Sequence, residues 1–368
     1  MVVILFLIVL AILIFVHELG HFLAAKSAGI RVDEFGLGFP PRAVAWRPKG
    51  SETTYSLNWI PFGGFVKIFG EDPEEAAVAG LDEKRSLTRK NRWIQVAVLA
   101  AGVTFNVLFA WVLISTGFLK GLPTSVAYDE SGLVEEPALT VIGVAPASPA
   151  EQAGIVGGDI ILFAEGETAS LQEEQLTVES FQNLVAESAD EGVTLLLKRD
   201  GETRSIVVVP EGDSNEERPV VGVYLDLIGV QQLPFPDAFI KGARLTGNLF
   251  VGVVRGLGAF IADAFSGRAD LSQITGPVGI AGLVGDASEL GFIYLVAFTA
   301  FISLNLAVIN LIPFPALDGG RILFVAIEAL KGSPISPRVA RTLNTVGFVL
   351  LILLMFVVTY NDIVRLIG

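Results

Sequence analysis

The feature that most restricts the fold of this sequence is a set of long apolar stretches with almost no charged side chains. A helix needs about 20 apolar residues to cross the hydrocarbon core of a bilayer. Stretches of about this length lie at residues 1–25, 93–119, 290–312 and 342–361. We therefore expect a polytopic α-helical membrane protein with about four transmembrane helices in the lipid bilayer.

The stretch at residues 1–25 also has the length of a secretory signal peptide. However, no basic segment precedes its apolar run and no small-residue cleavage site follows it. Instead, His17, Glu18 and His21 lie within the stretch. We interpret it as a retained transmembrane helix.

The composition excludes several classes of function. Charged residues make up 17% of the chain and hydrophobic residues 52%, which is typical of a membrane protein. The net charge of −14 disfavours binding to nucleic acid. Because the chain has no cysteine, disulfides, thiolate metal ligands and cysteine nucleophiles are excluded.

The distribution of charge predicts the orientation in the membrane. Residues 26–92 carry 11 basic and 9 acidic residues, and basic side chains crowd just before the second apolar stretch. The positive-inside rule assigns this loop to the cytoplasmic side. Residues 120–237 carry 22 acidic and five basic residues, a net charge of −17. We expect this region to be extracytoplasmic, with both termini outside, in a multi-pass protein of the inner (cytoplasmic) membrane.

A small soluble domain is predicted at residues 139–210. Short alternating runs bounded by turn residues indicate strands, and residues 178–188 have the apolar spacing of a helix. Within it, residues 147–162, ASPAEQAGIVGGDIIL, resemble the loop, helix and strand of bacterial PDZ domains. PDZ domains bind the ends of extended chains by strand addition. The alternative is a β-rich domain of another kind.

The segment at residues 235–268 has one apolar helical face, which basic and acidic side chains interrupt. This pattern favours an amphipathic helix at the membrane interface over a transmembrane helix. A kinked fifth transmembrane helix is the alternative.

The pentapeptide HELGH at residues 17–21 is the strongest functional motif. A spacing of four places His17 and His21 on one helical face, where both can bind one Zn²⁺, and Glu18 beside them can take a proton from bound water. Ionisable groups within a transmembrane helix are costly and are usually functional. The alternative is a pair of hydrogen-bonding histidines at a helix end.

A catalytic zinc ion usually has three protein ligands and one open position. The chain contains no further histidine and no cysteine, so the third ligand must be an oxygen. Asp318, in the LDGG segment at residues 313–321, is the best candidate because it follows the third apolar stretch and adjoins glycines that allow close backbone approach. Taken alone, Asp318 would be better interpreted as a turn residue before the two glycines; the incomplete zinc site favours the ligand role.

These motifs together resemble the site-two proteases, which are intramembrane zinc metalloproteases, and in particular the bacterial RseP/RasP branch. Two further stretches match in order. Residues 58–71 resemble the membrane-reentrant β-loop of the family, within the loop 26–92, and residues 276–280 resemble its Gly-Pro-Val-Gly element. The likeness covers nearly the whole chain.

The resemblance implies that His17, His21 and Asp318 bind one zinc ion and that Glu18 is the general base. It also implies a set of substrate-binding residues near the metal. These are Asn305, Asn310, Pro313, Pro315, Gly63, Gly64 and Phe65. A transmembrane substrate must lose helical hydrogen bonds before cleavage, and amides or a strand edge can replace them. For the two asparagines, the alternative role is hydrogen bonding between helices.

Two departures from the family pattern are visible. The second apolar stretch has Ala101-Gly102-Val103 ahead of Asn106, where relatives often have Ala-Gly-Pro. Only one PDZ-like domain fits before residue 235, as in the RasP type.

The sequence therefore predicts an intramembrane zinc endopeptidase. The expected substrates are single-span membrane proteins, trimmed first by another protease, such as anti-sigma factors or remnants of signal peptides. The alternative is a membrane-anchored PDZ scaffold that binds protein termini and has a non-catalytic metal site. Glu18 distinguishes the two, because a structural zinc site does not need a carboxylate between its ligands.

Overall fold

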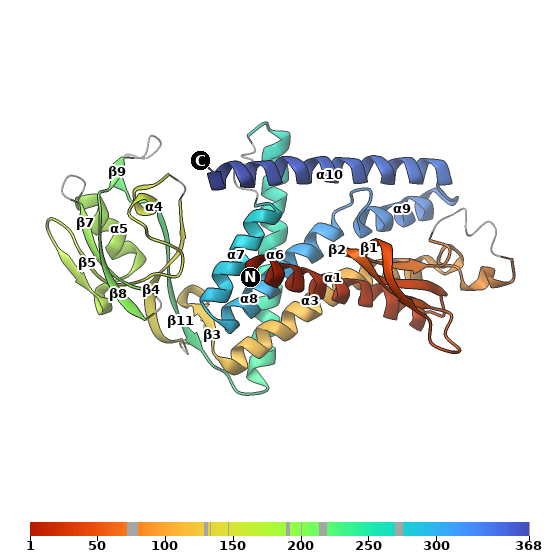
Figure 1. Ribbon diagram of the computed structural model, residues 1–368, viewed down its shortest axis with the longest axis horizontal. Helices are drawn as coiled ribbons and strands as arrows, with labels where there is room; N and C mark the ends of the chain where they lie inside the picture. Colours follow the sequence, from red (N-terminus) through yellow and green to blue (C-terminus); the bar gives the residue numbers. More distant parts are fainter. Residues whose placement is uncertain are drawn as a thin grey trace. The chain divides into compact units, whose positions relative to one another are not determined.

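The computed structural model describes residues 1–71, 80–128, 132, 134–145, 147–188, 192–199, 201–212, 219–268 and 275–367. The chain forms two compact units. The first comprises Met1–Thr116, Phe239–Glu289 and Leu295–Gly368, and the second comprises Gly117–Ala238 and Leu290–Tyr294. Figure 1 shows a largely helical first unit and a sheet-rich second unit.

The longer helices follow the apolar stretches of the sequence. In chain order they are α1 (Val2–Ser27), α3 (Arg92–Lys120), α6 (Asp237–Phe265), α7 (Pro277–Glu289), α8 (Phe292–Leu311), α9 (Asp318–Lys331) and α10 (Pro337–Ile367). Among the described residues, five of these helices, α1, α3, α6, α8 and α10, are long and apolar enough to cross a membrane. The sequence predicts four. The additional helix is α6, which is continuous where we expected an interfacial helix.

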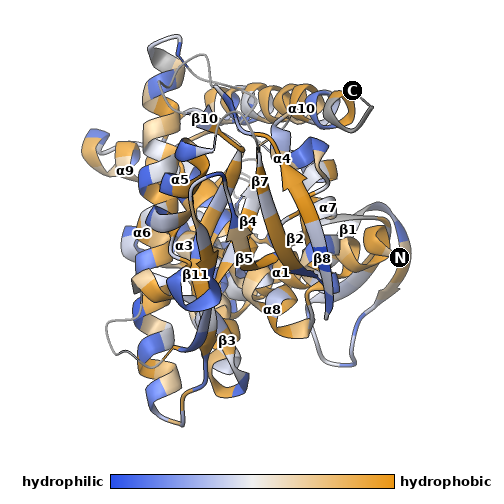
Figure 2. Cartoon of the chain, turned by 90° about the vertical axis from the view of Figure 1, so that its left-hand side faces the viewer, coloured by the Kyte–Doolittle hydropathy of each residue, from blue (hydrophilic) through white to orange (hydrophobic). Residues whose placement is uncertain are grey.

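The apolar surface of the first unit is extensive. Large hydrophobic side chains are exposed along α10, among them Phe348, Leu353 and Phe356, and Figure 2 shows this helix in orange over most of its length. Such surface is typical of helices that face lipid. Inside the unit, Val9 and Leu13 of α1 pack with α7 and α8 in a buried cluster.

A small bent sheet covers one end of α1. It consists of β1 (Val32–Trp46) and β2 (Thr54–Ile68), which pair antiparallel. Both strands bend, so that residues 34–37 pair with residues 64–67 on one side and with residues 54–57 on the other. The sheet therefore begins well before the predicted β-loop at residues 58–71 and is larger. Its buried face, with Val32, Phe35, Val66 and Ile68, packs with α1 and α3.

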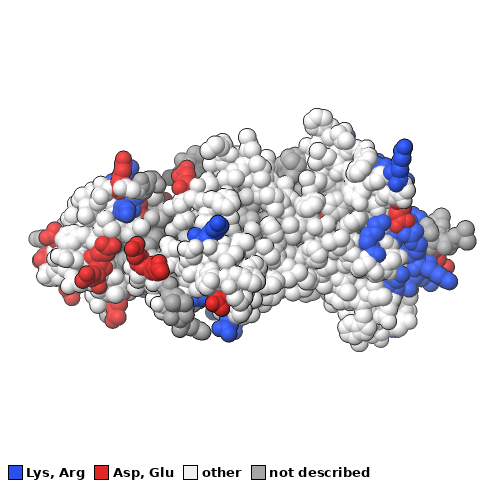
Figure 3. All heavy atoms as spheres, turned by 90° about the horizontal axis from the view of Figure 1, so that it is seen from below, with Lys and Arg blue, Asp and Glu red and all other residues white. Residues whose placement is uncertain are grey.

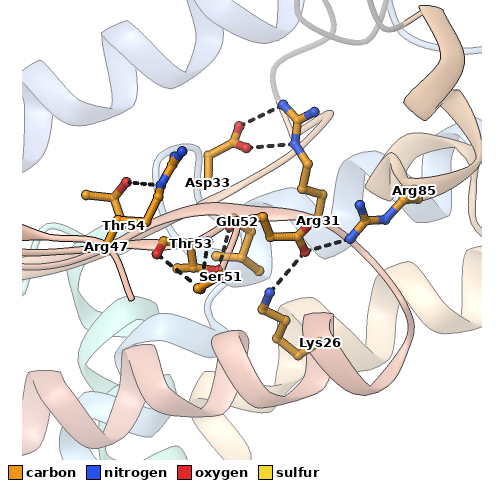
Figure 4. A network of polar contacts seen from close by, with 10 residues as sticks. Lys26, Arg31, Asp33, Arg47, Ser51, Glu52, Thr53, Thr54 and Arg85 are labelled. Atoms are coloured by element: carbon orange, nitrogen blue, oxygen red, sulfur yellow. Dashed lines mark hydrogen bonds and ion pairs between the residues drawn. The ribbon is translucent and has the colours of Figure 1, made fainter. Parts of the chain in front are cut away.

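Ion pairs fix this sheet to the neighbouring helix ends. Glu52, in the turn between β1 and β2, pairs with Lys26 of α1 at 3.0 Å and with Arg85 at 2.6 Å (Figure 4). Arg85 ends the 3-10 helix η1 (Gly80–Arg85), and η2 (Leu87–Arg89) follows. Figure 3 shows Lys and Arg side chains gathered on the part of the first unit that holds this sheet.

The second unit is built around a seven-stranded sheet. Its order is β3-β11-β4-β5-β7-β8, with β6 paired to β5. The strands are β3 (Leu122–Ser125), β4 (Glu135–Val144), β5 (Ile160–Glu165), β6 (Ser170–Gln172), β7 (Val193–Arg199), β8 (Glu202–Val208) and β11 (Val223–Gln231), with a separate short pair, β9 (Glu211–Gly212) and β10 (Pro219–Val220).

Two short helices complete the second unit. The side chain of Ser148 caps α4 (Pro149–Gln152), and Thr177 caps α5 (Val178–Glu187). The apolar face of α5 contributes Phe181 to the buried core of the sheet. The 3-10 helices η3 (Val126–Tyr128) and η4 (Glu173–Gln175) lie at strand ends.

Candidate metal centre

The two histidines lie on the buried face of α1, where this helix meets α3. His17 and His21 are each 7% exposed. Gly20 lies between them in the sequence, and a Cβ atom there would come within 2.5 Å of the Ala101 carbonyl oxygen of α3. The absence of a side chain at Gly20 therefore lets the two helices approach closely, and the imidazoles are enclosed between them.

Asp318 joins the histidines although it lies about 300 residues away in the sequence. Its Oδ2 atom is 3.0 Å from Nε2 of His17 and 3.3 Å from Nε2 of His21, and the two Nε2 atoms are 3.2 Å apart. Ligand atoms about 2.0–2.1 Å from a tetrahedral zinc ion are separated by about 3.3–3.4 Å. The three donor atoms thus have nearly the spacing that a single zinc ion requires.

A glycine of α3 leaves the space beside these donor atoms open. A Cβ atom on Gly102 would lie 2.4 Å from Nε2 of His21 and 2.7 Å from Nε2 of His17. In this arrangement Nε2 is the atom through which each ring could bind a metal ion. The donor set and the space beside it fit a metal ion with two nitrogen ligands and one oxygen ligand.

Hydrogen bonds from α3 orient both rings. The Nδ1–H group of His21 donates to the Val98 carbonyl at 2.8 Å, which leaves Nε2 free for a metal. The amide of Asn106 is 3.3 Å from Nδ1 of His17, and among the described residues no partner reaches its buried Oδ1 atom. With that amide turned by 180°, Oδ1 would accept from Nδ1–H of His17, which would leave Nε2 of His17 free.

The third donor is set by the loop before α9. Asp318 is the first residue of α9. The next two residues pack directly against backbone atoms at the end of α8 and in the loop that follows it. A Cβ atom on Gly319 or Gly320 would lie 2.2 Å from the carbonyl oxygen of Leu311 or Phe314, respectively. The Asp318 side chain is 16% exposed and contacts both histidines through one carboxylate oxygen.

Glu18 is half-buried and lies beside β2. A Cβ atom on Gly64 would be 3.1 Å from Cγ of Glu18 and 2.8 Å from Cγ2 of Ile14. Glu18 therefore lies next to His17 on α1 and against Gly64 of β2.

The remaining predicted site residues are more dispersed. Asn305 donates to the Phe301 carbonyl of its own helix at 2.9 Å, and Asn310 is half-buried near the end of α8. Pro313 is exposed, and Pro315 is half-buried. On β2, Gly63 has a φ of +88°, and the Phe65 ring lies against Gly36 of β1.

Our sequence reasoning missed three residues around the histidines: Val98, Gly102 and Asn106. Only Asn106 carries a signal in the sequence, because a fully buried amide in an apolar helix needs a polar partner. Ser303 of α8 donates to the Asn106 carbonyl at 2.9 Å, so α3 is held to α8 at the same level.

Comparison with known proteins agrees with this geometry. The model of peptidase family M50 matches residues 5–354. The chain is 32% identical to the zinc metalloprotease RasP of Geobacillus kaustophilus, with 97% of this chain and 96% of the relative covered. It is 30% identical to RasP of Oceanobacillus iheyensis, with 98% of both covered, and 28% identical to the regulator of sigma-W protease RasP of Bacillus subtilis, with 99% and 98% covered. The chain therefore belongs to peptidase family M50, the site-two proteases, and is a zinc metalloprotease of the membrane.

Proposed function

We propose that this protein cleaves single-span membrane proteins within the bilayer, with one zinc ion held by His17, His21 and Asp318 and with Glu18 as general base. The observation that carries the proposal is the separation of 3.0–3.3 Å among the three donor atoms. Two of these atoms, those of His17 and His21, lie on α1, which is otherwise apolar enough to span a membrane. The rival interpretation, a PDZ scaffold with a non-catalytic metal site, loses support because the family is one of zinc metalloproteases.

The reaction is hydrolysis of a peptide bond. Zinc, when bound, lowers the pKa of water and polarises the carbonyl group that is attacked. Glu18 accepts a proton from the attacking water as its oxygen forms the new bond to the carbonyl carbon. Glu18 then donates that proton to the amine nitrogen as the carbon–nitrogen bond breaks. The second proton of the water passes from the new carboxyl group to the amine, so the products are a carboxylate and a protonated amine.

The edge of β2 is suited to hold the substrate beside Glu18. Residues 64–68 pair with β1 on one side only within the described part of the chain. The opposite edge of this segment can accept an extended chain through backbone hydrogen bonds. Because Gly64 lies against Glu18, a strand added there runs past the general base. We assign Gly63, Gly64 and Phe65 to this role, and Asn305, Asn310, Pro313 and Pro315 to contacts with the unwound chain.

The direction of the helices supports four membrane crossings. The first half of α1 packs with α7 and with residues of α8 such as Leu295, while His17 and Asp318, near the far ends, meet. Thus α1 and α8 enter the membrane from the same side. The crossing by α3 returns the chain to the side where α1 began. If α6 then crossed the membrane, α8 would begin on the opposite side from α1, because α7, with 13 residues, is too short to cross back. We therefore assign α6 to the interface.

The charge distribution supports the orientation. The basic surface around the β1–β2 sheet favours the cytoplasmic side of the inner membrane, and the acidic second unit then lies outside. The zinc site is closer to that cytoplasmic side, because His17 and His21 both lie in the second half of α1.

We assign the second unit as a PDZ-like domain that selects trimmed substrates. A groove of about 820 Å³ lies between α5 and the start of β11, lined by Phe181, Val185 and Val223 among others. An extended chain end fits such a groove by strand addition. One relative is named for regulation of a sigma factor, and we infer anti-sigma factors or signal-peptide remnants as the substrate class here.

The test is cleavage of a trimmed single-span substrate by the purified protein in liposomes. We expect the wild type to cleave within the span and the Glu18→Gln variant to bind zinc but not cleave. Equal cleavage by both proteins would contradict the role of Glu18. Deletion of residues 139–210 tests whether this domain selects trimmed substrates. An unchanged preference for trimmed over full-length substrate would refute that role.

A further inference from the structure

The loop between α8 and α9 has a backbone conformation that alanine rarely adopts. Ala316, two residues before Asp318, has a φ of +78°, in the left-handed region that favours glycine. This conformation costs free energy and persists only where surrounding contacts enforce it. Here, the Ala316 N–H group donates to Oδ1 of Asn344 on α10 at 3.3 Å.

The approach of α10 to this loop depends on a second residue of the same helix. Gly347 lies three residues after Asn344, on the same helical face. A Cβ atom on Gly347 would lie 2.5 Å from the Pro315 carbonyl oxygen, so only glycine allows this distance. The amide that binds Ala316 and the glycine that leaves space for Pro315 together form one contact between α10 and the loop.

The shape of the loop determines the position of Asp318. Inside the loop, Phe314 N–H donates to the Ile312 carbonyl at 2.7 Å, and Leu317 N–H donates to the Phe314 carbonyl at 3.2 Å. The Gly320 backbone then packs on the Phe314 carbonyl. A change in the backbone conformation of Ala316 would therefore displace the Asp318 carboxylate, because the backbone between them is short and tightly packed.

Asn344 is also unusual for its helix. It is half-buried in the apolar stretch of α10, where a polar amide is costly unless it has a partner. Its side chain lines a cavity of about 420 Å³, together with Thr345 of the next position and Arg321 of α9.

We propose that Asn344 is a positioning residue for the metal centre: by holding Ala316 in its left-handed conformation, it fixes the Asp318 carboxylate against the two histidines. This role couples α10, which has a largely lipid-facing surface, to the zinc site. The inference rests on the proposed function only in taking Asp318 as a zinc ligand.

The first test measures zinc affinity of the metal-free protein in detergent, by competition with a chelating dye. We expect Asn344→Ala to weaken zinc binding by about tenfold and to lower kcat while KM for a trimmed substrate stays within about twofold. Asn344→Asp keeps the oxygen acceptor and should bind zinc like the wild type. Thr345→Ala, on the same cavity wall but without a hydrogen bond to the loop, is the matched control.

The second test is rescue. Glycine adopts a φ near +78° without strain, so adding Ala316→Gly to Asn344→Ala should restore most of the zinc affinity. The same variants loaded with Co²⁺ should show an altered visible spectrum for Asn344→Ala and a wild-type spectrum for the double variant. Wild-type zinc affinity and spectrum in Asn344→Ala, or a loss that Ala316→Gly does not repair, would overturn the positioning role.

Asp318→Ala separates this inference from the proposed function. If Asp318→Ala loses zinc and Asn344→Ala does not, only the positioning role fails. If Asp318→Ala binds zinc like the wild type, the ligand assignment fails and the positioning role fails with it. A wild type that binds zinc through Asp318 but does not cleave would refute the proposed function and leave the inference standing.

Discussion

Gly102 of α3 faces His21 of α1 so closely that a Cβ atom on the glycine would lie 2.4 Å from the Nε2 atom of that histidine. A methyl group there cannot be accommodated without displacing an imidazole, because the helix backbones are already in contact at Gly20. Although the chain departs from the Ala-Gly-Pro pattern of the family, it keeps the glycine, which leaves space for both imidazoles.

We predict that Gly102→Ala weakens zinc binding by about 100-fold or more, since zinc sites tolerate only small errors in ligand position. The measurement is the zinc content and affinity of the purified variant. Gly247→Ala is the control, because a Cβ atom at this helical position meets nothing within 4 Å. Retention of zinc by Gly102→Ala would show that the metal does not lie between these two nitrogens.

Asn106→Ala should weaken zinc binding by about 10-fold to 100-fold. The Asn106 amide lies 3.3 Å from Nδ1 of His17, and loss of such a partner lets the ring rotate away from the other donor atoms. Thr104→Ala, which removes only a hydrogen bond to Ala100 of the same helix, is the comparison. An equal effect of the two substitutions on zinc affinity would mean that Asn106 acts through helix packing alone.

The sequence predicts the part of the metal centre that depends on local geometry. Helical periodicity alone brings His17 and His21 to one face. Because the sequence has no other histidine and no cysteine, the third ligand must be an oxygen, and Asp318 is the best candidate. By contrast, the contacts of α3 with these rings come from packing between distant helices. Gly102 acts by having no side chain, and Val98 acts through its backbone carbonyl group. No pattern of side chains in the sequence predicts such contacts.

The fold was predicted with similar limits. Apolar length is sufficient to locate α1, α3, α8 and α10, because the bilayer imposes that length. It does not settle the role of α6, whose length permits crossing while its charges favour an interface. The β1–β2 sheet starts earlier than predicted, since its first strand contains Gly36 and Gly38, which interrupt the alternation that marks strands in a sequence.

Gly64→Ala should lower kcat by about 10-fold to 100-fold and leave zinc affinity unchanged. The added Cβ atom would meet Ile14 at 2.8 Å and Glu18 at 3.1 Å, so the strand edge must move away from the general base. Small displacements of this kind have large effects on rate. Steady-state cleavage and zinc titration of the variant, with Gly256→Ala as an unobstructed control, test the prediction. A wild-type kcat would argue that the substrate does not pass along this edge.

Glu52 should make stability depend on pH in the acidic range. The ion pair with Arg85 and then that with Lys26 lower the pKa of Glu52 from 4.5 to about 2. Because the folded protein has the lower pKa, the pairs stabilise the fold above about pH 4.5, and this contribution is lost as the pH falls towards 2. The side chains are about one-third exposed, so screening by solvent limits the effect to about 0.5–1 kcal/mol.

Thermal unfolding of the wild type and Glu52→Gln in the same detergent tests this dependence on pH. We expect the wild type to have the higher Tm at pH 7, with a difference that shrinks progressively between about pH 4.5 and pH 2. Glu83→Gln, which removes an exposed ion pair with Arg89 at 2.5 Å, should change Tm little at any pH. A Tm difference for Glu52→Gln that stays constant down to pH 2 would show that packing of the turn, and not its charge, anchors the β1–β2 sheet to α1.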